Sequence, residues 1–141
     1  MKFLHISDLH IGKYVNGYRM LDDQRYMLER IVEIIKEKNP DALLIAGDIY
    51  DKSLPSAEAV ELFDSFMTEI AGLHGKTGLK TFVISGNHDS PERIGYFNKL
   101  IELNGIFTDG VFEGVARKNT VECDGAVSYT HLRAHETRHD L

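Results

Sequence analysis

Short apolar runs alternate with longer segments of helical periodicity along the first hundred residues. Residues 2–7, 41–46 and 81–85 are apolar runs with the length of β-strands. Residues 22–38 and 56–71 lie between these runs and repeat apolar side chains at helical spacing. The pattern therefore predicts strand, helix, strand, helix and strand, in that order.

The apolar positions predict which face of each helix packs on the sheet. In the first helix these positions are Met27, Leu28, Ile31, Ile34 and Ile35. In the second helix they are Val60, Phe63, Met67 and Ile70. A third helix is expected from residue 90 to about residue 103, because an N-cap serine, a proline and an acidic residue follow one another at 90–92.

Strands that alternate with helices are typical of a parallel sheet covered by those helices. The second run is apolar from residue 42 to residue 46, which indicates a strand covered on both faces. We expect His5, inside the first strand, to pack in the core, and His74, in a glycine-rich segment, to lie in a solvated loop. Because ligands of parallel sheets bind at the carboxyl ends of the strands, functional groups are expected there.

Polar clusters follow all three predicted strands. Asp8 and His10 come directly after the first, and alternation along an extended chain would send both side chains to the same side. Asp48 and Asp51 follow the second strand, and residues 87–89 (Asn, His, Asp) follow the third. One such cluster alone is typical of a capped turn. Three at equivalent strand ends indicate a site.

These side chains suit divalent metal ions. Carboxylate, imidazole and amide ligands without a thiolate favour Mn, Mg, Fe or Zn over copper or an iron–sulfur cluster. A carboxylate can bridge two ions, and such a pair can clamp a phosphate and activate a water molecule. The sequence therefore predicts hydrolysis of a phosphate ester.

Composition indicates how many domains the chain forms and where in the cell it would act. The chain of 141 residues, 43% hydrophobic, is long enough for one packed domain. Its single cysteine, Cys123, forms no internal disulfide, and no run is long enough for a membrane helix, so we expect a cytoplasmic protein. The formal charge of −6 argues against nucleic-acid binding, but several of the acidic residues belong to the expected metal site, where cations would reverse the local charge.

The motifs also carry a family resemblance. D-x-H, GDxxD and GNHD, in that order at strand ends, resemble the calcineurin-like metallophosphoesterases. The stretches "HISDLHIGKYVNGY", "PDALLIAGDIYDKSLPSAEAV" and "VISGNHDSPERI" are similar to SbcD-type nuclease subunits, over residues 1 to about 125. The resemblance implies an α/β fold, the first half of an α/β/β/α sandwich.

The resemblance also implies residue roles. Asp8 and His10 match ligands of the first metal ion, Asp48 matches the bridging carboxylate, and Asn87 matches a ligand of the second ion. His88 matches the catalytic histidine that contacts the scissile phosphate. Two further carboxylates are weaker assignments. Asp89 would orient His88 and Asp51 would brace the metal ligands, but each is equally well explained as a turn cap.

The same resemblance implies substrate, cofactor and partners. It indicates two Mn²⁺ ions, DNA ends and hairpins as substrates, and a role in DNA repair, recombination and replication. It also implies an SbcC-type ATPase subunit as partner and a homodimer within a heterotetramer, away from any membrane. Lys13, Tyr14 and Arg19, in the loop after the first motif, would either contact DNA phosphates or only keep the loop soluble.

Two alternatives stay open. First, phosphatases and cyclic-nucleotide phosphodiesterases share this set of metal ligands, although a phosphatase would be expected to carry Arg where this chain has Lys52. The second alternative is that the chain is an inactive fragment that only binds partners. No stretch matches the GHxH motif that the family uses for further metal ligands, so we expect weak activity or none.

The end of the sequence departs from the resemblance. Residues 126–141 hold three histidines at intervals of four, an arrangement that binds metal on some helices. The stretch lacks both the GHxH motif and apolar periodicity. We therefore expect a metallophosphoesterase domain over residues 1–125, followed by an unstructured or foreign tail. The three histidines are His131, His135 and His139.

Overall fold

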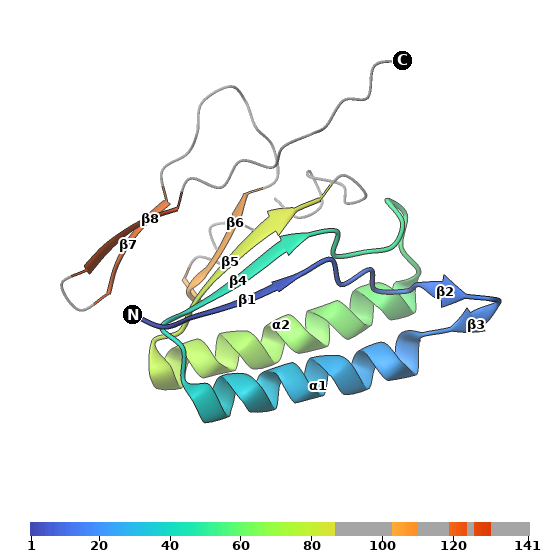
Figure 1. Ribbon diagram of the computed structural model, residues 1–141, viewed down its shortest axis with the longest axis horizontal. Helices are drawn as coiled ribbons and strands as arrows, with labels where there is room; N and C mark the ends of the chain where they lie inside the picture. Colours follow the sequence, from blue (N-terminus) through green and yellow to red (C-terminus); the bar gives the residue numbers. More distant parts are fainter. Residues whose placement is uncertain (87–102, 110–118, 124–125, 131–141) are drawn as a thin grey trace, which may run out of the picture.

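A four-stranded parallel sheet forms the centre of the computed structural model, which describes residues 1–86, 103–109, 119–123 and 126–130 (Figure 1). The strand order is β1-β4-β5-β6, and each neighbouring pair is parallel. The strands are β1 (Phe3–Ser7), β4 (Ala42–Gly47), β5 (Lys80–Ser85) and β6 (Ile106–Asp109). The expected α/β class with a parallel sheet is confirmed.

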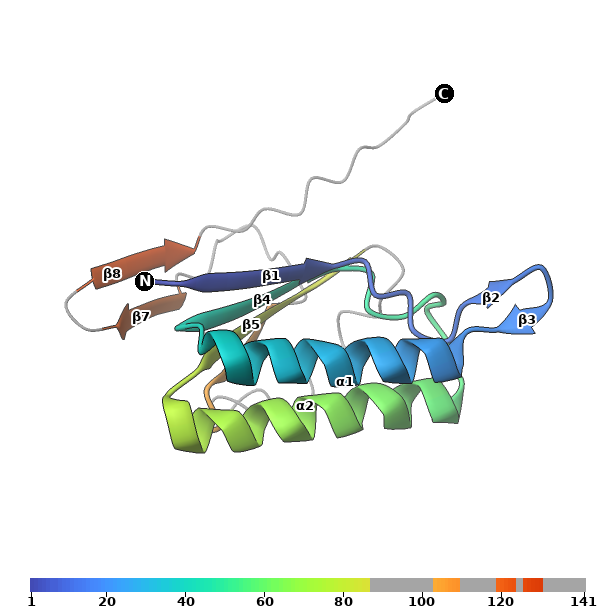
Figure 2. The same cartoon turned by 60° about the horizontal axis from the view of Figure 1, so that its bottom comes forward.

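Two long helices connect the first three strands of this sheet. Helix α1 (Leu21–Lys38) joins β1 to β4, and α2 (Ala57–Thr77) joins β4 to β5. Both connections step in the same direction across the sheet, so crossovers of the usual hand place both helices on the same face. Figures 1 and 2 show α1 and α2 side by side beneath the sheet. The helix expected from residue 90 lies largely outside the described residues.

Two small antiparallel sheets complete the described part of the chain. Strand β2 (Tyr14–Val15) pairs with β3 (Tyr18–Arg19), and β7 (Asn119–Cys123) pairs with β8 (Ala126–Thr130). Strand β8 thus begins directly after the domain boundary predicted at residue 125. That boundary stays a prediction, and the three tail histidines lie outside the described residues.

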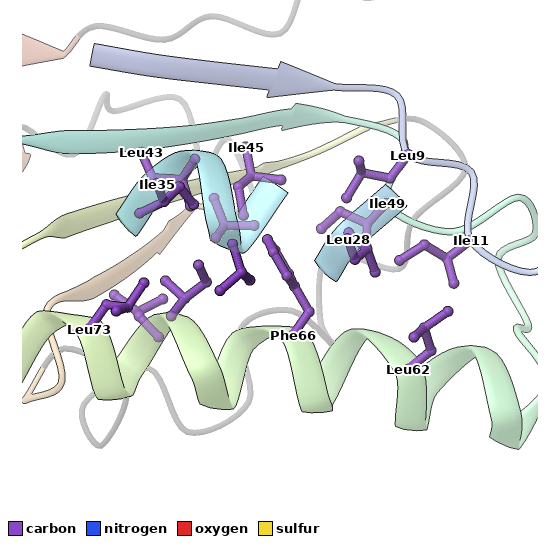
Figure 3. Packing of buried hydrophobic residues seen from close by; sticks show 14 of the residues in the cluster. Leu9, Ile11, Leu28, Ile35, Leu43, Ile45, Ile49, Leu62, Phe66 and Leu73 are labelled. Atoms are coloured by element: carbon purple, nitrogen blue, oxygen red, sulfur yellow. The ribbon is translucent and has the colours of Figure 1, made fainter. Parts of the chain in front are cut away.

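The hydrophobic core lies between the sheet and the two helices. Leu43 and Ile45 of β4 point toward the helices, where they meet Ile35 of α1 and Phe66 of α2 (Figure 3). Each of these side chains is less than 4% exposed. Burial of one such side chain contributes about 1.5–3 kcal/mol, so this layer stabilises the packing of both helices on the sheet.

The opposite face of the sheet is less covered, which corrects two expectations. Leu4 and Ile6 of β1 pack against the core, so alternation turns His5 to the other face, where it is exposed rather than packed. In β4, Leu44 and Ala46 are only half-buried, although the apolar run predicted cover on both faces. The reason is the position of α1 and α2, which cover the same side (Figure 2).

The buried stripes of the helices also differ from the predicted ones. In α1, Met27 and Ile34 are more than a third exposed, and Val32 is buried in their place. In α2, Ile70 is buried as predicted, whereas Val60 is exposed and Phe63 and Met67 are only half-buried, each one position away from the buried line. That line consists of Ala59, Leu62, Phe66, Ile70 and Leu73. The helix is apolar over a wide arc, so periodicity alone leaves its rotation open by about one residue.

Helix α2 runs six residues further than predicted. It continues through Gly72 and Gly75 and ends at Thr77, where Gly78 adopts a left-handed conformation with φ 75° as the C-cap. His74 therefore lies in the last turn of a helix and not in a loop. Its Nδ1 lies 2.8 Å from the carbonyl oxygen of Leu79, a contact that ties the helix end to the start of β5.

No helix in the described ranges is both long enough and apolar enough to cross a membrane.

Candidate metal centre

The loops that follow β1 and β4 run side by side beyond the ends of these strands. Backbone hydrogen bonds join them, from Asp8 N to Ala46 O (3.1 Å) and from His10 N to Asp48 O (3.0 Å). Ile11 N donates to Ile49 O at 2.8 Å. These bonds extend the β1–β4 pairing into the loops and hold the two polar clusters together.

Left-handed backbone positions Asp8 and His10. Their φ angles are 53° and 44°, values that side chains other than glycine adopt rarely. The strand itself ends at Ser7, so the extended alternation that was expected to bring both side chains to one side is wrong. They meet because the chain coils after the strand, at a conformational cost that is typical of functional sites.

Apolar side chains between the polar ones anchor this coil. Leu9 is 8% exposed and Ile11 is 1% exposed, and both belong to the core cluster. Figure 3 shows Leu9 beside Ile49, and Ile11 pointing toward Leu62 of α2. The buried side chains of Leu9 and Ile11 thus anchor this loop to the core, while Asp8 and His10 face the loop that follows β4.

The polar side chains converge on a small volume. One donor atom from each of Asp8, His10 and Asp48 lies within 4.8 Å of the other two. Asp8 is exposed, His10 is half-buried, and Asp48 is 8% exposed. Asp48 is the most buried of the three, and a bound cation would stabilise its carboxylate there.

Two glycines make room for these carboxylates. A Cβ atom on Gly47 would lie 2.6 Å from Oδ1 of Asp8, and one on Gly86 would lie 2.0 Å from Oδ1 of Asp48. Real Cβ atoms do not approach other atoms so closely, so any other residue here would displace a carboxylate. The strand-end glycines therefore have a steric role, in addition to the sharp turn at Gly47, where φ is 81°.

His10 has a carboxylate behind its ring. Its Nδ1 lies 3.6 Å from Oδ1 of Asp51, and both side chains are about a quarter exposed. A carboxylate in this position orients an imidazole and leaves Nε2 as the nitrogen for a metal ion. The distance is longer than that of a hydrogen bond, so the bracing role, one of two interpretations of Asp51 from the sequence, stays a prediction.

Gln24 of α1 holds the loop from the other side, and the sequence analysis missed it. Its Oε1 accepts a hydrogen bond from Gly12 N at 2.9 Å, and its Nε2 donates to the carbonyl oxygens of His10 at 2.8 Å and Leu9 at 3.3 Å. Gln24 is 9% exposed. A polar residue on the otherwise apolar face of α1 was the available signal, since buried amides are retained where they have partners.

The described residues fit a divalent cation. Two carboxylates and one imidazole form a mixed oxygen and nitrogen donor set, which suits Mn²⁺, Mg²⁺, Fe²⁺ or Zn²⁺. The structure thus brings together three of the four expected metal ligands. The fourth, Asn87, lies outside the described residues, as do His88 and Asp89. Gly86, the last described residue before them, lies against Asp48.

The chain was compared with models of known protein families. The family model for calcineurin-like phosphoesterases matches residues 1–139, almost the whole chain.

Proposed function

This chain belongs to the calcineurin-like phosphoesterase family, and from that premise we propose that it is a metal-dependent phosphodiesterase that cuts DNA. Family membership implies a hydrolase that uses divalent metal ions, and the parallel α/β sheet agrees with part of the family's fold. The DNA substrate is the further step. It is supported by the stretches of sequence that resemble SbcD-type nuclease subunits.

The convergence of Asp8, His10 and Asp48 carries the proposal. Divalent ions bound there would polarise a phosphate and lower the pKa of a water molecule so that it can attack phosphorus. Paired loops, buried apolar neighbours and strand-end glycines fix the positions of these donor atoms. Such preorganisation is what metal affinity requires.

The remaining roles follow from the resemblance. We assign Asn87 to a second metal ion, with Asp48 as the bridging carboxylate, and Mn²⁺ as the ion at both positions. We assign His88 to the scissile phosphate, where an imidazole can donate a proton to the leaving oxygen. Asp89 would orient that imidazole.

We also propose the substrates, the cellular process and the partner protein. DNA ends and hairpins would be the substrates, in repair, recombination and replication in the cytoplasm. An SbcC-type ATPase would be the partner of a homodimer of this chain.

The test is cleavage of a fluorescent hairpin DNA by the full chain in Mn²⁺, compared with Asp48→Asn. We expect slow, Mn²⁺-dependent cleavage, because the sequence contains no GHxH motif for further metal ligands, and we expect the variant to abolish it. A cyclic nucleotide and a phosphoserine peptide serve as competing substrates. Preferential hydrolysis of either, or cleavage of no substrate at all, would contradict the proposal.

A further inference from the structure

A pocket of about 310 Å³ lies beside the metal centre. The two sites share Asp51, whose carboxylate lies near His10 on one side and lines the pocket on the other. Side chains from the loop before β2, from α1 and from the segment before α2 complete the wall. The lining residues used below are Lys13, Tyr14, Arg19, Lys52 and Leu54.

Three cationic side chains line this pocket. Within the described part of the chain, Lys13 and Lys52 form no ion pair. Arg19 pairs with Glu58, whose carboxylate raises the pKa of the guanidinium through a hydrogen bond and charge attraction. Two lysines are therefore available to an anion, in a protein whose formal charge is −6.

Both long helices begin at this pocket. Leu21, the first residue of α1, and Ser56, the N-cap of α2, belong to its lining. The partial positive charge of each helix N-terminus adds to the charge of the lysines. The first turns also carry Asp22, Asp23 and Glu58, whose carboxylates offset part of this partial charge, so the two lysines are the main source of positive potential for an anion.

Apolar surface completes the lining. Tyr14 is 54% exposed and Leu54 is 73% exposed, a large apolar area for side chains on a water-facing wall. Tyr14 lies on the β2–β3 hairpin, which projects beyond the carboxyl ends of the parallel strands (Figures 1 and 2). Asn16 and Gly17, both with positive φ, form its two-residue turn, a combination that favours a defined hairpin.

We propose that this pocket binds one nucleotide of single-stranded DNA, next to the bond that the metal centre cuts. Lys13 and Lys52 take the phosphate, and the ring of Tyr14 stacks on the base. This inference rests on the proposed function and assigns the residues that position its substrate. A volume of about 310 Å³ is at the lower end of the range for small-ligand sites, which suits a single nucleotide and excludes a duplex.

The combination of charge and aromatic surface selects this ligand. A simple phosphate ester would need the lysines only, since it has no ring to stack. A base has a flat face that stacks on aromatic side chains whatever its identity. Adjacent positive charge and aromatic surface are therefore the features expected of a single-strand site without sequence preference.

The experiment measures binding without cleavage. Fluorescence anisotropy of a labelled short oligothymidine is recorded with the full chain at low salt in EDTA. We expect Lys13→Gln/Lys52→Gln to weaken binding about tenfold and to lower the salt slope by about one to two, one unit for each lost phosphate contact. Lys36→Gln/Lys38→Gln, at the far end of α1, removes the same charge and is expected to stay within about twofold of wild type.

The aromatic part has its own pair of variants. Tyr14→Ala should weaken binding about tenfold, and Tyr14→Phe, which keeps the ring, should restore it. Unchanged binding in Tyr14→Ala or in the Lys13/Lys52 variant would overturn the proposal. Equal losses in the Lys36/Lys38 control, or no binding by the wild-type chain, would do so as well.

The outcomes separate this inference from the proposed function. Metal-dependent DNA cleavage together with unchanged binding by the pocket variants would reject the pocket and keep the nuclease. Pocket-dependent binding without cleavage in any metal would reject the nuclease and keep the nucleotide site.

Discussion

Nδ1 of His10 faces the carboxylate of Asp51 at a distance of 3.6 Å, across the two loops that carry the metal ligands. Asp51 is itself held in place, because its backbone N–H donates to the carbonyl oxygen of Ile11 at 3.2 Å. Asp51 is therefore joined to the loop of His10 through both its backbone and its side chain.

We expect Asp51→Asn to lower Mn²⁺ affinity by about 10–100-fold, as is typical when the carboxylate behind a metal-binding histidine is removed. Isothermal titration calorimetry measures the affinity, and the far-UV circular dichroism spectrum should stay unchanged. Asp64→Asn, on α2 and outside the metal cluster and the nucleotide pocket, is the matched loss of charge. An equal loss of affinity in Asp64→Asn would contradict a bracing role for Asp51.

Gln24→Leu removes three hydrogen bonds that hold the loop of His10. The variant leaves buried backbone groups without their partner, so the free energy of unfolding should fall by about 1–3 kcal/mol. Mn²⁺ affinity should fall with it, because the loop of His10 loses its hold on α1. Urea denaturation and calorimetry give the two values.

Glu29→Gln, which is exposed on the same helix, is the control for Gln24→Leu and should change neither value. If Gln24→Leu lost stability but bound Mn²⁺ as tightly as wild type, Gln24 would support the fold only.

Gly86→Ala should disrupt the metal centre, because its Cβ would lie 2.0 Å from Oδ1 and 2.5 Å from the backbone N of Asp48. The carboxylate, the backbone or both must move, so we expect loss of measurable Mn²⁺ binding and a lower melting temperature. Gly72→Ala makes the same chemical change in the interior of α2, where no atom outside the helix's own backbone lies within 4 Å of the new Cβ.

That second variant should raise stability by about 0.5–1 kcal/mol through helix propensity. Opposite signs for the two glycines are the expected result. Mn²⁺ binding by Gly86→Ala at wild-type strength would show that the close approach to Asp48 has no functional role.

Leu43→Ala should lower the free energy of unfolding by about 2–5 kcal/mol, because Leu43 is 0% exposed in the centre of the core. Ile34→Ala, at a position 38% exposed on α1, should cost much less. Chemical denaturation of both variants measures the difference. Similar losses would mean that the second face of α1 is also packed in solution.

Periodicity was sufficient to predict the framework of the fold. The parallel strands and the two long helices up to residue 85 were predicted within two residues of their ends, except for the end of α2, whereas the short strands β2 and β3 lie in a stretch that was expected to be a loop. The end of α2 was missed because Gly72 and Gly75 were taken as loop residues, whereas packing of Leu73 keeps the chain helical past them. Burial of one helix face outweighs a propensity cost of about 1 kcal/mol per glycine.

The sequence predicted which residue types form the site, but not the backbone conformation that brings them together. The ligand types at the strand ends indicated a metal, and the structure brings Asp8, His10 and Asp48 together. The route differs, because left-handed backbone at Asp8 and His10 depends on loop pairing that no local pattern encodes. Gln24 was missed for the same reason, since its partners lie 12 to 15 residues away along the chain.

The backbone of Asp8 and His10 has a consequence for protein engineering. Each residue occupies a conformation that glycine would adopt without cost, so replacing both by glycine should relax the loop. A library selected only for thermal stability would be expected to enrich these glycine replacements. The selected variants would be more stable but would lack the side chains of Asp8 and His10 that are expected to bind metal. Engineering of this protein for stability should therefore keep Asp8 and His10 unchanged and measure metal affinity together with the melting temperature.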